Sequence, residues 1–110
     1  LNWSIHIANA SFAKKHPEIL RAAYLALRNE AAQAREDPAR ITATYKKFGA
    51  SDTQLGVMKT FDVPRILPMD KQAVSDLEKQ ARQYADYGFI KRAPEDFSAF
   101  VLDFSDAGGK

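Results

Sequence analysis

Two histidines, His6 and His16, could take part in more kinds of chemistry than the other residues of this chain. An imidazole can bind a metal ion, transfer a proton or donate a hydrogen bond to an anion. The two fall on different predicted elements, and neither has a carboxylate at the spacing of a metal-ligand set, so we expect no metal site. Ser4 precedes His6 by two residues in a short segment that is predicted to be extended. Both therefore lie on one face and offer hydrogen-bond donors to an oxyanion.

A second group of charged side chains, Lys14 and Lys15, stands directly before His16 and Pro17. Proline suits the first position of a helix, where its missing N–H would have no partner. The two lysines then end the preceding helical turn, where positive charge offsets the negative end of the helix dipole. We expect both lysines to face solvent as part of a helix boundary and not to bind a ligand.

Catalytic constellations are missing from the sequence. It contains no phosphate-binding glycine loop, no nucleophile elbow and no zinc-protease motif. Asp103 and Asp106 can share a helix face, but no base or nucleophile accompanies them. We therefore predict no catalytic residue and no cofactor, and we expect a protein that is not an enzyme.

Composition narrows the class further. The chain has 110 residues, 45% of them hydrophobic and 27% charged, which is typical of a folded domain. It has no cysteine, and no apolar run approaches the roughly 20 residues that span a bilayer. Its formal net charge is +2, with basic and acidic residues interspersed. A phosphate-backbone binder concentrates its basic residues, so we expect no nucleic-acid partner.

The hydrophobic pattern predicts a mostly helical chain. Apolar and polar residues alternate from Trp3 to Ala8, which indicates a short strand. Asn9 or Ser11 then caps a brief helix that ends at Lys15. Three-and-four spacing and capping residues predict further helices at 17–36, 38–48, 51–61 and 70–87. We expect about four to five helices and one or two short strands in all, in a single segment with a disordered tail at 105–110.

Helix boundaries are marked by particular residues. Ser51 and Gln54 have the spacing of a capping box, and Asp70 precedes the last long helix as its N-cap. Gly49 and Gly88 follow helices at the position that favours a left-handed backbone. Two prolines make the segment 62–70 an extended link. After Pro94 the aromatic spacing fits either a last helix or an extended tail.

Three stretches carry a resemblance to a known family: FAKKHPEILRAAYLAL, DPARITATYKKFGAS and ILPMDKQAVSDLEKQARQYADYGFIKRAPEDFSAFV. In order and spacing they resemble the C-terminal portion of the periplasmic substrate-binding proteins of ABC importers, in the branch for aliphatic sulfonates, taurine and nitrate. The shared features are F-x-x-x-H-P-E, D-P before a helix, and a helix ending in G-x-I-K. The stretch VPRILPMD and Gly56 depart from the pattern.

The resemblance implies a larger protein of the type II periplasmic-binding-protein class. Such a protein is α/β and two-lobed, closes around a small anionic solute and delivers it to an ABC permease in the membrane. It is periplasmic, or exported and lipid-anchored. The strand at the start of this chain would then run near the cleft between the lobes, which makes Trp3, Ser4 and His6 the candidate ligand-binding residues. Alternatively, His6 is a half-buried strand residue with one ring nitrogen bonded.

The main alternative is a small helical module that binds a protein partner through an apolar groove, because amphipathic helices with short loops are sufficient for such a bundle. A basic helix-turn-helix domain fits less well, since the positive charge is dispersed. If the resemblance holds, these 110 residues are an excised piece of the parent. We then expect them not to bind the anion alone and to self-associate through uncovered apolar faces.

Overall fold

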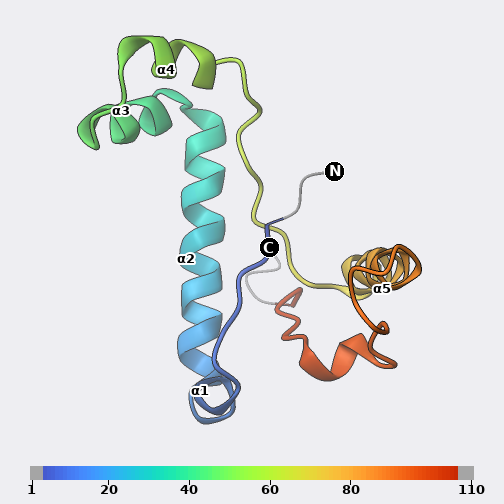
Figure 1. Cartoon of the computed structure of the whole chain (residues 1–110). Helices are drawn as coiled ribbons and strands as arrows, with labels where there is room; N and C mark the ends of the chain where they lie inside the picture. The colour runs from blue at the N-terminus through green and yellow to red at the C-terminus, as the bar shows by residue number, and fades with distance from the viewer. Residues whose placement is uncertain (1–3, 107–110) are drawn as a thin grey trace. The chain divides into compact units, whose positions relative to one another are not determined.

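A computed structural model describes residues 4–106, and the chain divides between Ile66 and Leu67 into two compact units. Within the described residues the regular structure consists of five α-helices and one short 3-10 helix, without a strand (Figure 1). This confirms the mostly helical prediction. No described helix is both long enough and apolar enough to cross a membrane.

The first unit begins with two helices that share one residue. α1 (Ala10–Lys15) is capped by Asn9, whose side chain accepts the Phe12 N–H at 3.0 Å. The His16 N–H then bonds to the Phe12 carbonyl at 2.8 Å and closes α1. The His16 carbonyl accepts the Ile19 N–H at 3.1 Å and opens α2 (Pro17–Glu36), with Pro17 at its first position. Asn9 is therefore the cap, and the helix boundary at His16 and Pro17 is confirmed.

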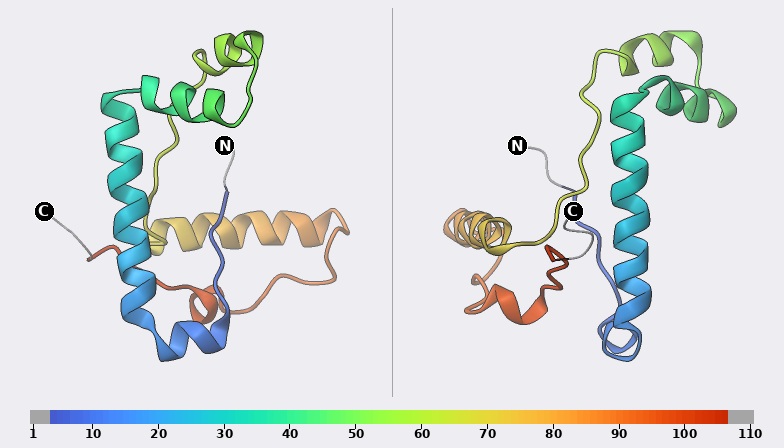
Figure 2. Two further views of the ribbon diagram at one scale, coloured as in Figure 1. Left: turned by 90° about the vertical axis from the view of Figure 1, so that its left-hand side faces the viewer. Right: turned by 180° about the vertical axis from the view of Figure 1, so that it is seen from behind.

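α2 is the longest helix, and α1 and α3 pack against it (Figures 1 and 2). The three-and-four spacing of apolar residues gives α2 one apolar face, which is only partly covered. Half-buried positions on that face include Leu20, Tyr24, Ala31 and Ala34, whereas Ala23 and Leu27 are exposed. Beyond α2, Arg40 bonds back to Gln33 at 2.6 Å and pairs with Glu30 at 3.1 Å.

α3 (Ala39–Lys47) and α4 (Asp52–Met58) form the end of the first unit. α3 stops at Gly49, whose φ of +94° lets its N–H reach the Lys46 carbonyl and the Ala50 N–H reach the Tyr45 carbonyl, both at 3.0 Å. Two bonds of this kind make a Schellman motif. α4 opens on the predicted capping box: Ser51 and Gln54 each accept the other's backbone N–H.

The second unit holds α5 (Lys71–Asp86) and the 3-10 helix η1 (Phe97–Phe100), which packs against it (Figure 2). Asp70 caps α5 as predicted by accepting the Ala73 N–H at 2.9 Å. Gly88, with φ of +78°, ends it in a second Schellman motif, in which the Phe89 N–H bonds to the Tyr84 carbonyl. After Pro94 the sequence fitted either a last helix or an extended tail, and the structure has the short helix η1.

Two expectations about the elements are wrong within the described residues. Residues 4–9 lack a strand, because a strand requires ladder hydrogen bonds to a neighbour and this segment has none. The helix predicted at 51–61 ends at Met58. There Thr60 donates its hydroxyl to the Val57 carbonyl at 2.7 Å, in a turn that replaces further helical bonds. Boundaries of the other long helices differ from prediction by about one residue, as is usual for helix ends.

The apolar core is small in both units. Among the described residues, the buried hydrophobic side chains are Leu55 in the first unit, 8% exposed, and Leu77 in the second, 9% exposed. Large apolar side chains elsewhere stay in contact with solvent, including Ile7, Phe48, Phe61, Tyr87 and Phe100. Each unit therefore presents apolar surface that it does not cover itself. The predicted tail at 105–110 falls largely outside the described residues.

Candidate functional site

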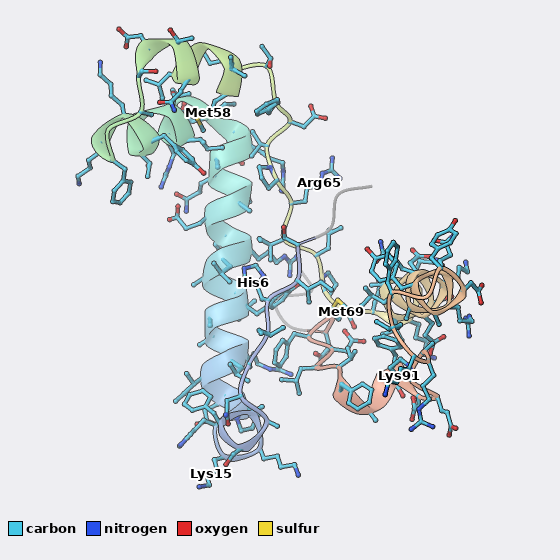
Figure 3. All side chains as sticks on the ribbon, in the orientation of Figure 1. His6, Lys15, Met58, Arg65, Met69 and Lys91 are labelled. Carbon is cyan, nitrogen blue, oxygen red and sulfur yellow. The ribbon has the colours of Figure 1, made fainter. Side chains whose placement is uncertain are left out.

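The predicted ligand-binding residues lie at the start of the first unit, where Trp3 falls outside the described residues. Ser4 and His6 belong to the non-helical segment before α1, and both are exposed (Figure 3). The idea that His6 is a half-buried strand residue is therefore wrong. A role of these residues in binding an anion stays a prediction.

Lys14 and Lys15 occupy the last turn of α1 and are exposed, in the positions predicted for them. Their neighbour His16 packs its ring against Phe12 at a centroid distance of 5.1 Å, and its Nδ1 lies 3.5 Å from Glu18 Oε1. His6 and His16 are not brought together with a third ligand. Among the described residues no group of three His, Cys, Asp or Glu side chains is placed to hold a metal ion.

A groove of about 590 Å³ lies between α3 and α4 in the first unit. We call it the α3–α4 groove. Its lining residues come from the end of α3, the loop after it and one face of α4: Tyr45, Phe48, Gly49, Ala50, Thr53, Gln54, Val57 and Met58. The Schellman motif at Gly49 and the capping box after it set the turn that places the two helices side by side.

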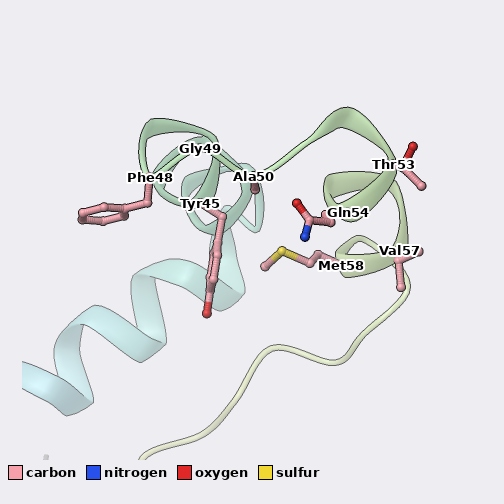
Figure 4. A pocket seen from close by; sticks show the side chains of 8 residues that line it. All are labelled: Tyr45, Phe48, Gly49, Ala50, Thr53, Gln54, Val57 and Met58. Carbon is pink, nitrogen blue, oxygen red and sulfur yellow. The ribbon is translucent and has the colours of Figure 1, made fainter.

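Apolar side chains dominate this groove. Met58 extends from α4 toward the ring of Tyr45, while Phe48 points away from α4 (Figure 4). The lining is also open to solvent, since Tyr45 is 51%, Val57 52% and Phe48 83% exposed. Met58 is half-buried. Aromatic and methionine side chains are enriched in protein interfaces.

Three lysines are neighbours in sequence of residues that line the groove. Lys46 and Lys47 stand between Tyr45 and Phe48 in the last turn of α3, and Lys59 follows Met58 at the end of α4. The one acidic residue beside the lining is Asp52. All three lysines are exposed, and the ion pairs recorded among the described residues involve none of them. None of the three lysines lines the groove, and on α3 Lys46 and Lys47 fall on the face opposite Tyr45 and Phe48.

A smaller groove of about 240 Å³ lies in the second unit between α5 and the segment after η1. Three carboxylates line it, but two already accept local hydrogen bonds. Asp70 caps α5, and Asp103 accepts the Ser105 N–H at 2.8 Å. The third, Glu78, lies 4.0 Å from Arg82. These contacts show that the three carboxylates stabilise the helix and the turn.

Comparison with protein-family models, with curated proteins and with solved structures finds no match for this chain. The functional assignment therefore depends on the residues themselves.

The α3–α4 groove was not predicted from the sequence. Tyr45 and Phe48 fit a helical stripe with Ile41, and such a stripe predicts a core face. Only Ile41 is half-buried, however, because α4 is short and covers little of the end of α3. The sequence carried no signal of this exposure, because Lys46 and Lys47 between the two aromatic residues fall on the opposite face of the helix, as in any amphipathic helix.

Proposed function

We propose that this chain is the C-terminal portion of the solute-binding component of an ABC importer for a small anion such as an aliphatic sulfonate, taurine or nitrate. In this proposal the whole protein is a two-lobed α/β protein of the periplasm, or one exported and lipid-anchored. It transfers its solute to a membrane permease. His6 and Ser4 donate hydrogen bonds to the anion, and Trp3 lies beside it.

The observation that carries the proposal is the small core of the two units. A chain of this length normally buries about two-thirds of its unfolded surface, with many fully buried side chains. Here the described residues bury Leu55 and Leu77 and leave large apolar groups exposed on most helices. A segment that completes its core against another lobe of the same protein would have this pattern. The helix order and caps also agree with the motifs on which the family resemblance depends.

The reading frame that encodes the chain provides the first test. We expect the codons upstream of Leu1 to encode an export signal followed by an α/β lobe. The product of that frame should then bind taurine, ethanesulfonate or nitrate in a calorimetric titration. A start codon directly before Leu1, or a whole product that binds none of the three anions, would contradict the proposal.

A second candidate function, a helical module that binds another protein, is favoured by the α3–α4 groove. Its lining is apolar and open, and it lies within one unit, so it does not require a second lobe to form. The same upstream sequence distinguishes the two functions, because an interaction module needs no export signal and no partner lobe.

A further inference from the structure

We draw no further inference here: the strongest candidate, the open apolar α3–α4 groove at the end of the first unit, has no charged side chain in its lining, and nothing in the described residues shows what covers it.

Discussion

Asn9, Ser51 and Asp70 each begin a helix by the same contact, in which a short side chain accepts the backbone N–H three residues later. Hydrogen bonds from Thr42, Thr44 and Thr60 to backbone carbonyls are similarly local, spanning three or four positions. Arg40 reaches further, back to Gln33 and Glu30 of α2. The caps fix where these helices begin.

The choice of Asn9 over Ser11 as the cap of α1 can be tested directly. Asn9→Ala removes the acceptor for the Phe12 N–H and should cost about 1 kcal/mol of helix stability. Ser11→Ala removes a polar group inside the helix, and its cost in helix stability should be much smaller. Thermal melts followed by circular dichroism compare the two. A larger loss of stability for Ser11→Ala than for Asn9→Ala would show that Asn9 is not the cap.

His6 carries the prediction on anion binding. In the whole protein, His6→Ala should weaken binding of the preferred anion by about 1 to 3 kcal/mol, as expected for a lost hydrogen bond to a charged group. Lys14→Ala and Lys15→Ala are the controls, since both lysines lie in the exposed last turn of α1. Calorimetric titration measures all three. Equal losses at the three positions would show that the lysines belong to the site.

Two helices of this chain are terminated by the backbone conformation of a glycine. α3 and α5 both stop at a glycine with positive φ, and each is followed by a residue whose N–H bonds back to a tyrosine carbonyl. Glycine is favoured there because other residues lose energy in the left-handed region. The two Schellman motifs determine the direction in which the chain leaves each helix, and the first of them positions one wall of the α3–α4 groove.

Substitutions at three glycines test this conformational argument against one another. Gly49→Ala and Gly88→Ala should each destabilise the fold by about 1–2 kcal/mol, because a methyl group is disfavoured at φ of +94° and +78°. Gly56→Ala should stabilise α4 by about 1 kcal/mol, because Gly56 is in a helix interior. Apart from the local backbone, no heavy atom of the described residues lies within 4 Å of a Cβ at any of the three sites, so the three substitutions differ in backbone conformation. Denaturation by urea measures the changes, and a stabilising Gly49→Ala would refute the conformational argument.

Sequence patterns predicted the helices well because caps and glycine stops are local signals. Asp70, Gly49 and the pair Ser51 and Gln54 could each be assigned without knowledge of the rest of the fold. The strand at the N-terminus could not, because alternation shows only that an extended segment would have two unlike faces. Whether it pairs depends on a neighbour. The groove was missed for the same reason: exposure of Tyr45 depends on how much α4 covers.

As a whole, the molecule leaves apolar area available for association. Among residues 4–106 each unit buries one leucine, which is a small core, and helices of this kind gain most of their stability from packing. Further copies of the chain, or the rest of a larger protein, would remove that area from water.

We therefore expect the 110-residue chain alone to self-associate and to bind no anion with micromolar affinity. Hydrogen bonds from an exposed Ser4 and His6 compete with water and yield little net free energy. Light scattering should give a mass above that of a monomer, and titration with taurine, ethanesulfonate and nitrate should give no heat of specific binding. A clean monomer with micromolar affinity would show that the chain is a complete binding domain.

The segment between the two units has a practical consequence for proteolysis. From Asp62 to Met69 the chain is non-helical, and Arg65 is exposed there, followed by isoleucine and not by proline. A protease must draw an extended stretch of backbone into its cleft, which helices resist. Trypsin at low dose should therefore cut early after Arg65 and, in the second unit, after Lys91 or Arg92. Mass spectrometry of the first fragments would reveal these sites, and early cuts within α2 instead would show that this helix frays before the segment does.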